Sequence, residues 1–505
     1  MAYSVKERPC PEQDFIMCKI MKFVTKFSER TYFCDMGRRT SRKIFAQVAV
    51  IDAGAKGKAV AKSPDGRVLF IDNAIPGDVV TVQTTKKRKA YYQATAIEFH
   101  EYSKDRVPAL CEHFGVCGGC KWQHMAYDKQ LFYKNKEVQD HLQRIGGITP
   151  TEVLPILGAP DQFYYRNKME YSFSSQKWLT KAQIESHEVI HNRNALGFHI
   201  PGYWDKILDL KQCHLQDSLG NEIRDHIKSK AEASDLVFFD PRAQTGHLRT
   251  LMLRNTTLGQ WMVLIQFYED PGALKETLLN SIAEQFPAVH SLLYVINQKA
   301  NDTLYDQDIH VFAGNDYIEE AMGDLRFRIN AKSFYQTNSK QAIGLYDVIK
   351  EFAGLDGTQG VYDLYTGTGT IAQYLAAEAK WVVGIEAIPE AITAAKDNAQ
   401  RNKIDNAQFY VGDMKELFNE NFIAAHGKAD VVITDPPRDG MHKTVVAQLL
   451  ALGAPRIVYV SCNSATQARD LALMTDHYAV VKSRTVDMFP QTHHVENVVL
   501  LEKIS

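Results

Sequence analysis

The sequence predicts a multidomain fold. We expect a small, OB-like β-barrel at the N-terminus, a central α+β domain, and a C-terminal α/β domain with a Rossmann-like sheet. The 505 residues are enough for about three domains. Short strand-like runs between Gly and Pro turns fill residues 41–101, and strand-like and helix-like runs alternate through residues 331–505. The content of 45% hydrophobic and 23% charged residues is that of a globular protein, which excludes a disordered or fibrous chain.

Neither a membrane protein nor a disulfide-rich secreted protein fits this composition. No run approaches the roughly 18 apolar residues that a membrane-spanning helix needs. The first 35 residues carry charges of both signs and lack the apolar segment of a secretory leader. Eight cysteines are too few for a disulfide scaffold of this length. We expect a cytoplasmic protein that acts as a monomer and does not bind membranes.

Residues 1–40 form an extension of uncertain status. They show no clear periodicity, and Met36 directly precedes a basic run. Our hypothesis is that Met36 is the natural start. N-terminal sequencing of the native protein that reads Met1 or Ala2 would contradict it.

Residues 41–101 predict the barrel. The strand-like runs IFAQVAVI, RVLFI, VVTVQ and AYYQATAIEF are separated by the turns SPDG and IPGD. Residues 37–104 hold thirteen Lys and Arg against six Asp and Glu, a net charge of +7 that leaves −9 for the rest of the chain. Basic side chains beside Tyr91 and Tyr92 suit RNA backbone and base stacking. A generic barrel with buried tyrosines is the alternative.

The central domain, residues 102–330, opens with a cysteine motif. CEHFGVCGGC places Cys111, Cys117 and Cys120 within ten residues, and a metal centre then needs a fourth ligand. Cys213 is the downstream candidate, because Cys462 has another assignment. Three close thiols and one distant thiol favour a [4Fe–4S] cluster. Zinc remains the alternative, although zinc sites usually use two C-x2-C pairs, and free thiols are a third possibility.

The C-terminal domain, residues 331–505, carries acids at the ends of its strands. VYDLYTGTGT is a buried strand that runs into a Gly-rich turn, and the next three strand-like runs end at Glu386, Asp413 and Asp435. Ligands of doubly wound sheets bind at the carboxyl ends of the strands. Three acids suit the cationic sulfonium of S-adenosylmethionine better than the phosphates of a dinucleotide. Simple capping of the following helices is the alternative.

The last two motifs indicate covalent chemistry. RIVYVSCN brings Cys462 to a strand end beside the cofactor cleft, where a thiol is well placed as a nucleophile. Glu496, in HHVENVVLL, is a candidate general base. A buried structural cysteine is the alternative for Cys462. The pair His493 and His494 beside Glu496 also suits a metal, but no third ligand is evident.

Taken together, these motifs resemble the RNA uridine-5-methyltransferase family, in the branch with an iron–sulfur cluster and a TRAM domain that acts on 23S ribosomal RNA. CEHFGVCGGC with Cys213, SFYQTN, DLYTGTGT, DPPR, SCN and HHVE occur in the family's order from about Arg42 onward. The resemblance implies a class I methyltransferase domain and a TRAM-like RNA-binding barrel. It also implies that segment 123–155 packs with the catalytic domain.

The resemblance implies a role for each matching residue. Cys462 matches the nucleophile and Glu496 the base. The cofactor positions are Gln336, Tyr365, Thr370, Glu386, Asp413 and Asp435, and the cluster ligands are Cys111, Cys117, Cys120 and Cys213. The sequence departs from the family at Tyr365, Thr366, Thr370 and Ser464, and Asp413 stands where some relatives have Asn. None of these changes removes a needed functional group.

The expected activity is therefore methylation of a uridine in 23S ribosomal RNA at C5, with S-adenosylmethionine as donor. Three alternatives stay open. The first is the same reaction on transfer RNA, whose enzymes in this family usually lack the cluster and the TRAM domain. The second is a cytosine-5-methyltransferase, which leaves the HHVE motif unexplained. The third is a non-enzymatic RNA-binding iron–sulfur protein.

Overall fold

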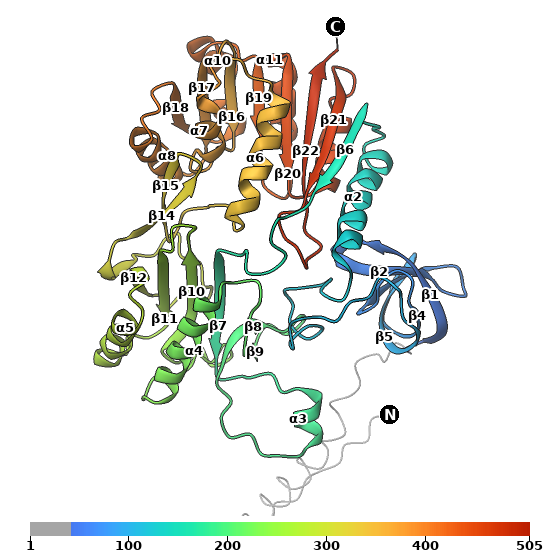
Figure 1. Cartoon of the computed structure of the whole chain (residues 1–505), viewed down its shortest axis with the longest axis vertical. Coiled ribbons are helices and arrows are strands. Elements are labelled where there is room, and N and C mark those ends of the chain that lie inside the picture. The colour runs from blue at the N-terminus through green and yellow to red at the C-terminus, as the bar shows by residue number, and fades with distance from the viewer. Residues whose placement is uncertain (1–41, 505) are drawn as a thin grey trace, which may run out of the picture.

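The computed structural model describes residues 42–504. The hypotheses about Met36 and the extension 1–40 therefore lie outside the described residues. The chain forms a barrel, a central domain around a seven-stranded sheet, and a catalytic body around an eight-stranded sheet. The catalytic body lies above the central domain and the barrel in Figure 1. No helix within residues 42–504 is long and apolar enough to cross a membrane.

The N-terminal barrel is closed, with strand order β1-β2-β3-β5-β4. Its strands are β1 (Ile44–Gly54), β2 (Lys58–Lys62), β3 (Val68–Asp72), β4 (Val79–Lys87) and β5 (Tyr91–Glu101). Tyr92 is 1% exposed in the barrel core, and its hydroxyl donates to Asp65 Oδ2 over 2.8 Å. Neighbouring residues of a strand face opposite sides, so only Tyr91 of this pair points outward. The predicted stacking surface is wrong for Tyr92.

The central domain is a largely antiparallel sheet covered by two helices. Its order is β13-β12-β11-β10-β7-β8-β9. The strands are β7 (Lys168–Ser174), β8 (Ala195–His199), β9 (Ile207–Asp209), β10 (Leu248–Asn255), β11 (Trp261–Phe267), β12 (Val289–Ile296) and β13 (His310–Gly314). The helices α4 (Ser218–Glu232) and α5 (Ala273–Gln285) bury Ile223, Ile227, Leu279 and Ile282 in one apolar core with Tyr171 and Phe173. The short helix α3 (Lys181–Glu185) lies in the long β7–β8 connection.

The catalytic sheet has the order β18-β17-β16-β19-β20-β22-β21-β6. The parallel strands β16 (Gly360–Leu364), β17 (Trp381–Glu386), β18 (Ala407–Val411), β19 (Val431–Thr434) and β20 (Arg456–Ser461) form its first part. The strand β22 (Glu496–Lys503) runs antiparallel to both β20 and β21 (Tyr478–Val486). The chain crosses over between β16 and β19, and this is where doubly wound sheets bind ligands.

Helices cover both faces of this sheet. The helices α6 (Ser339–Ala353), α7 (Thr370–Ala376) and α8 (Pro389–Arg401) pack on the face that carries Val361 and Val382. The opposite face, which carries Tyr362 and Val383, is covered by α9 (Met414–Leu417), α10 (Glu420–His426), α11 (Lys443–Leu452) and α12 (Ser464–Ala472). Adjacent apolar residues thus enter opposite cores. Fully buried parallel strands are continuous apolar runs for this reason.

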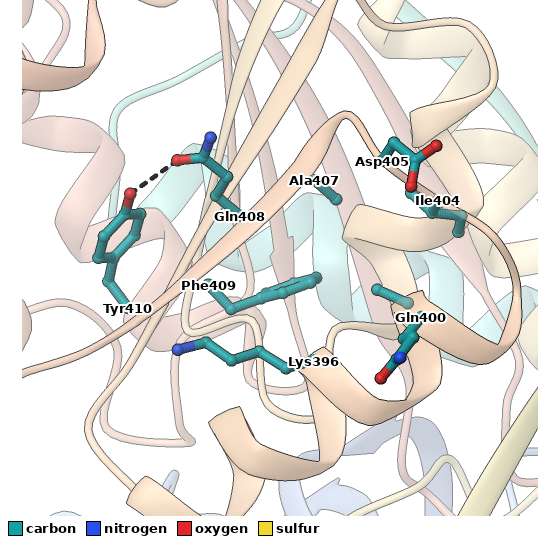
Figure 2. A pocket seen from close by; sticks show the side chains of 9 residues that line it. Lys396, Gln400, Ile404, Asp405, Ala407, Gln408, Phe409 and Tyr410 are labelled. Carbon is teal, nitrogen blue, oxygen red and sulfur yellow. Dashed lines mark hydrogen bonds between the residues drawn. The ribbon is translucent and has the colours of Figure 1, made fainter.

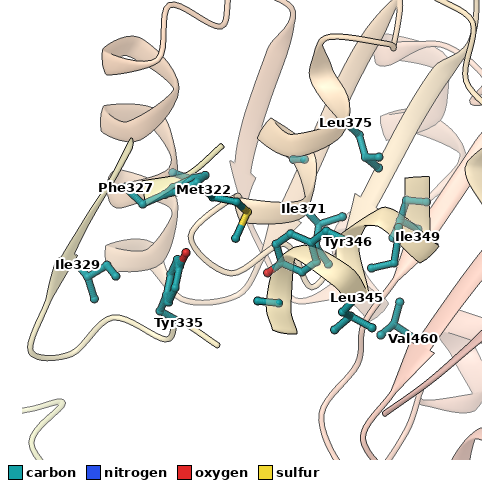
Figure 3. Close-up of a cluster of buried hydrophobic side chains, with 14 of the residues drawn as sticks. Met322, Phe327, Ile329, Tyr335, Leu345, Tyr346, Ile349, Ile371, Leu375 and Val460 are labelled. Carbon is teal, nitrogen blue, oxygen red and sulfur yellow. The ribbon is translucent and has the colours of Figure 1, made fainter. Parts of the chain in front are cut away.

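A small hairpin joins the central domain to the catalytic body. It consists of β14 (Tyr317–Met322) and β15 (Leu325–Asn330). Met322 and Phe327 of the hairpin lie in one apolar cluster with Tyr346 of α6 and Ile371 of α7 (Figure 3). The same cluster includes Met262 and Leu264 of β11, so the hairpin packs between the central sheet and the helices of the C-terminal sheet.

Segment 123–155 also lies against the catalytic body. The helix α2 (Tyr127–Arg144) packs on α12, where His141 Nδ1 and Ser464 Oγ are 2.8 Å apart. The next strand, β6 (Glu152–Leu157), pairs in parallel with β21 and is the outermost strand of the sheet. The chain thus enters the catalytic sheet, leaves it to build the central domain, and returns.

Candidate active site

The carboxyl end of β16 forms the centre of the candidate site. Asp363 is 1% exposed, and its Oδ2 accepts hydrogen bonds from Thr366 Oγ1 over 2.5 Å and Ala372 N over 3.1 Å. The turn that follows has positive φ at Tyr365 (64°) and Gly369 (75°). A Cβ at Gly369 would lie 2.8 Å from the Phe409 ring, so this position requires glycine.

Glu386 closes the same turn from the end of β17. Its Oε2 accepts from Gly367 N over 3.2 Å, and its Oε1 accepts from Ala387 N over 2.7 Å and Ile388 N over 3.1 Å. These bonds fix the carboxylate beside the Gly-rich turn. It can still accept hydrogen bonds from ribose hydroxyls, because each carboxylate oxygen has more than one acceptor site.

Asp413 has a helix-capping role. Its Oδ1 accepts from Lys415 N over 2.9 Å at the start of α9, and its side chain is 47% exposed. The helix-capping alternative is therefore realised at this position. The neighbouring Lys415 ammonium and the capping bond both hold the pKa of Asp413 below its usual value.

Gln336 and Thr370 come from the two segments that border the turn. Gln336 is 9% exposed, and its main-chain carbonyl accepts from Asn167 Nδ2 of the central domain over 3.0 Å. Thr370 begins α7, and its hydroxyl is 2.9 Å from Tyr346 Oη. The Thr370 hydroxyl is thus already paired within the protein.

Three carboxyl groups share the floor of the site. Burial raises the pKa of Asp363 to about 7. Burial and the charge of Asp363 raise the pKa of Asp435 to about 7. Burial and the charge of Asp435 hold the pKa of Glu496 well above its usual range. Asp363 Oδ1 is buried without a hydrogen-bond partner among the described residues. This concentration of acidic groups suits a cation.

Cys462 lies against the same group of acids. Burial, followed by the charges of Glu496 and Asp435, raises the pKa of its thiol to about 11. The Arg438 guanidinium opposes this shift by its charge and by a hydrogen bond to the thiol. The Arg438 carbonyl accepts from Asn463 Nδ2 over 2.9 Å, which holds DPPR against the residues that follow β20, where Cys462 lies. The sequence analysis assigned no role to Arg438, although this residue ends the DPPR motif, three residues after Asp435.

The four motif cysteines gather at the start of the central domain. The charge of Cys213 raises the pKa values of Cys111, Cys117 and Cys120, so all three thiols lie within its electrostatic reach. Burial is the larger cause, and it raises the pKa of Cys117 to about 11 and that of Cys120 to about 12. All four are free thiols.

Residues 111–120, here called the cysteine loop, and the segment of Cys213 are supported by hydrogen bonds to their main chain. Cys213 N donates to Asn221 Oδ1 over 2.8 Å, and Cys111 N donates to Gln123 Oε1 over 3.1 Å. Across residues 42–504, no group of three or more His, Cys, Asp or Glu side chains is arranged to hold a metal ion.

An open pocket of about 470 Å³ lies elsewhere on the catalytic body (Figure 2). Lys396 and Gln400 of α8 line it together with Phe409 and Tyr410 of β18. Tyr410 Oη donates to Gln408 Oε1 over 2.7 Å. The pocket contains none of the predicted site residues.

Comparisons with known proteins identify the family. The family described as tRNA (Uracil-5-)-methyltransferase matches residues 306–504. A Bacteroides thetaiotaomicron protein described as an uncharacterized RNA methyltransferase is 51% identical over 451 residues, which cover 89% of this chain and 99% of that protein. A Porphyromonas gingivalis protein of the same description is 50% identical over 462 residues, with coverage of 90% and 98%. This chain belongs to the RNA (uracil-5-)-methyltransferase family.

A solved structure extends the similarity to the whole fold. Pyrococcus abyssi tRNA (uracil-54, C5)-methyltransferase, in complex with S-adenosyl-L-homocysteine, matches with a TM-score of 0.69 and 29% identity. The match covers 90% of this chain and 100% of that chain. The predicted RNA (uracil-5-)-methyltransferase family and the S-adenosylmethionine-dependent RNA methyltransferase activity are confirmed.

Proposed function

We propose that this enzyme methylates a uridine of 23S ribosomal RNA at C5 by covalent catalysis, with Cys462 as nucleophile and Glu496 as general base. The meeting of Cys462, Asp435, Arg438 and Glu496 at one end of the sheet carries the proposal. Uracil C5 is a poor nucleophile by itself. A thiol that adds to the neighbouring carbon overcomes this difficulty.

The proposed reaction has three steps. First, the Cys462 thiol loses its proton to solvent and its sulfur bonds to C6, which moves the electron pair of the C5=C6 bond onto C5 and O4. Second, C5 bonds to the methyl group, and the carbon–sulfur bond of the donor breaks. Third, Glu496 takes the proton from C5, the C5=C6 bond re-forms, and the bond between C6 and Cys462 breaks.

Arg438 and Asp435 are proposed to assist different steps of this reaction. The Arg438 guanidinium stabilises the Cys462 thiolate before attack and after release. The charge of Asp363 acts on Asp435 and the charge of Asp435 acts on Glu496, which supports a role for Asp435 toward both the donor and the target base. A uridine stacked in RNA must be extruded to reach these groups, which costs a few kcal/mol.

The acidic site fits S-adenosylmethionine. When bound, this donor supplies a methyl group on a positively charged sulfur. The unpaired Asp363 Oδ1 and the neighbouring Asp435 offer the negative potential that such a cation needs. The positions proposed to hold the donor are Gln336, Tyr365, Thr370, Glu386, Asp413 and Asp435. Asp413 and Thr370 would contribute through groups that already bond to Lys415 and Tyr346.

We further propose a [4Fe–4S] cluster on Cys111, Cys117, Cys120 and Cys213. Support comes from their mutual electrostatic coupling and from the apolar core against which Cys117 and Cys120 pack. These four thiolates would hold the cluster, which would join the segment of Cys111, Cys117 and Cys120 to that of Cys213. The methyl transfer involves no electron transfer, so the proposed cluster acts as a structural brace for the loop.

Two observations bear on the RNA substrate. The TRAM-like barrel carries the basic run Lys86, Lys87, Arg88 and Lys89 at the end of β4 and in the turn to β5, which suits the phosphate backbone of RNA. Together with the resemblance of the motifs to the 23S branch of the family, it supports ribosomal RNA as the substrate. The Pyrococcus abyssi neighbour, by its description, methylates tRNA, and this favours tRNA as the second candidate.

One experiment tests the reaction and the substrate together. The enzyme is incubated with S-adenosylmethionine labelled in the methyl group and with unmodified transcripts of 23S rRNA and of tRNA, and the product nucleosides are separated. Label in 5-methyluridine from 23S rRNA is the expected result, whereas label from tRNA alone would overturn the ribosomal assignment. Cys462→Ala should abolish transfer, and turnover by this variant would contradict the covalent mechanism. If Cys462→Ala loses methyl transfer but still binds RNA, the wild-type protein is an enzyme and not only an RNA-binding protein.

A further inference from the structure

Glu496 directly follows a long connection in the catalytic sheet. Residues 487–495, here called the strap, join β21 to β22, and Val486 pairs with Glu496 where the strap begins and ends. Glu496 itself is 6% exposed. The position of its carboxylate therefore depends on how the strap is held.

The first residue of the strap is anchored to α2. Asp487 is fully buried, and its Oδ1 accepts from Lys134 Nζ over 2.6 Å. Its Oδ2 accepts from the hydroxyl of Tyr127 over 2.9 Å. Lys134 Nζ also donates to the carbonyl of Phe489 over 3.0 Å. Two residues of one helix thus hold both the side chain and the main chain of the strap.

The middle of the strap is strained and is held by the same helix. Gln491 has a φ of 68°, a left-handed conformation that is unfavourable in a residue other than glycine. Its N donates to Gln130 Oε1 over 3.0 Å, and its Oε1 accepts from Gln130 Nε2 over 3.1 Å. Its carbonyl accepts from Lys121 N over 2.9 Å and from Trp122 N over 3.0 Å.

The central domain and the barrel also contact the strap. Tyr165 of the central domain donates its hydroxyl proton to the carbonyl of Pro490 over 2.9 Å. In the barrel, Gly57 lies against His493, because a Cβ at Gly57 would be 3.1 Å from His493 Cβ. The strap therefore contacts the barrel, the residues that follow the cysteine loop, α2 and the central domain.

We propose that Gln130 is a positioning residue for Glu496, acting through Gln491. Gln130 is 1% exposed and makes four hydrogen bonds: the two to Gln491, and two more from Nε2 to the carbonyls of Trp122 and Met125. This residue links the loop after the cysteine motif to the strained centre of the strap. The proposal rests on the proposed role of Glu496 as the base.

The proposal predicts a defect in one step of the reaction. Gln130 is uncharged, so its replacement changes the geometry of the strap without adding or removing a formal charge near Glu496. Within the described residues, neither Gln130 nor Gln491 hydrogen-bonds to Cys462 or Arg438, so formation of the bond to C6 should be slowed much less than the step of Glu496. Proton removal from C5 needs an accurately placed base, and a displacement of about 1 Å can slow such a step about a hundredfold.

The test compares RNA that contains uridine with RNA that contains 5-fluorouridine. Fluorine cannot leave C5 as a cation, so fluorinated RNA stays attached to Cys462 after methyl transfer, whatever the state of the base. Its rate of attachment therefore reports the steps before Glu496 acts. The rate at which methylated uridine RNA is released reports the step of Glu496. Transcripts of 23S rRNA and of tRNA are used in parallel, and attached RNA is detected as a complex stable in SDS.

Three variants are compared with the wild type. Gln130→Met has similar length but cannot hydrogen-bond to Gln491. Gln130→Asn keeps an uncharged amide on a side chain that is one methylene shorter. Leu142→Ala is the control, because Leu142 is a fully buried residue of α2 that lies about three helical turns from Gln130, in the apolar core shared with α12. We expect Gln130→Met to attach fluorinated RNA at nearly the wild-type rate and to release methylated RNA at least about tenfold more slowly.

The remaining outcomes separate the two proposals. The release rate of Gln130→Asn should lie between those of Gln130→Met and the wild type, and Leu142→Ala should release RNA normally. Equal slowing of attachment and release by Gln130→Met, or normal release, would overturn the positioning role. Should that variant not fold, Gln130→Asn takes its place, because its shorter side chain cannot make both bonds to Gln491, and normal release would again overturn the role. Absence of attached RNA with the wild type would instead overturn the covalent mechanism, and the positioning role with it.

Discussion

The buried pair Lys134 and Asp487 gives the sharpest prediction for stability. Both side chains are 0% exposed, and the Lys134 ammonium lies 2.6 Å from Asp487 Oδ1. Burial lowers the pKa of Lys134, and the Asp487 carboxylate opposes this shift. Lys134→Met removes the cation and leaves Asp487 with only neutral hydrogen-bond donors, the Tyr127 hydroxyl and Phe489 N. Loss of one partner of a buried ion pair costs about 3–5 kcal/mol, and we expect Lys134→Met to lose this amount.

A second substitution isolates the charge. Asp487→Asn keeps an oxygen for the Tyr127 hydroxyl and removes the uncompensated charge. The double variant Lys134→Met, Asp487→Asn should therefore regain about 1–3 kcal/mol of unfolding free energy relative to Lys134→Met alone. Urea unfolding is followed by tryptophan fluorescence, because the Trp122 ring lies 6.0 Å from Lys134 Nζ and reports this region. A loss below about 1 kcal/mol for Lys134→Met, or a double variant less stable than the single one, would refute the reasoning.

Three further predictions concern the cofactor sites and the sheet. Because the pKa values of Asp363 and Asp435 stand at about 7, and a bound cation favours their ionised forms, affinity for S-adenosylmethionine should rise as the pH rises through 7. Calorimetry should find a weaker pH dependence for S-adenosylhomocysteine, whose sulfur is neutral, and equal dependences would contradict this. Cys213→Ser should lower the iron and acid-labile sulfide content of anaerobically purified protein, and an unchanged content would remove Cys213 from the ligand set. Gly360→Ala should destabilise the catalytic sheet by about 1–3 kcal/mol in thermal unfolding, since the added Cβ would lie 2.1 Å from the Trp381 ring, and an unchanged midpoint would show that the ring moves aside freely.

Local patterns account for the parts of the fold that were predictable. The parallel strands β17, β19 and β20 are short apolar runs that end in the polar residues Glu386, Thr434 and Ser461, and β16 carries Asp363 one residue before its end. The same polar ends gather Asp363, Asp435 and Cys462 at one edge, because parallel strands share their carboxyl edge.

Long-range pairing was outside the reach of local patterns. The run EVLPIL of β6 has nothing that marks Lys482 or Arg484 of β21 as its partners. On α2, Tyr127, Gln130 and Lys134 share one helical face, which as a polar stripe is typical of a solvent-exposed surface. In the fold that face meets the strap. The error at Tyr92 was avoidable, because strand alternation allows only one of two adjacent tyrosines to face outward.

The late position of the strap has a consequence for synthesis on the ribosome. Lys134 and Asp487 are separated by 353 residues. At roughly 5–20 residues per second, α2 waits roughly 18–70 s after emerging before its buried lysine can meet a counter-ion. Through that interval β6 also lacks its partner strand, so its unpaired edge is open to other chains. Slow or interrupted translation of this protein therefore favours aggregation of its nascent chains. Chaperones that cover strand edges should associate with the first half of the chain during synthesis.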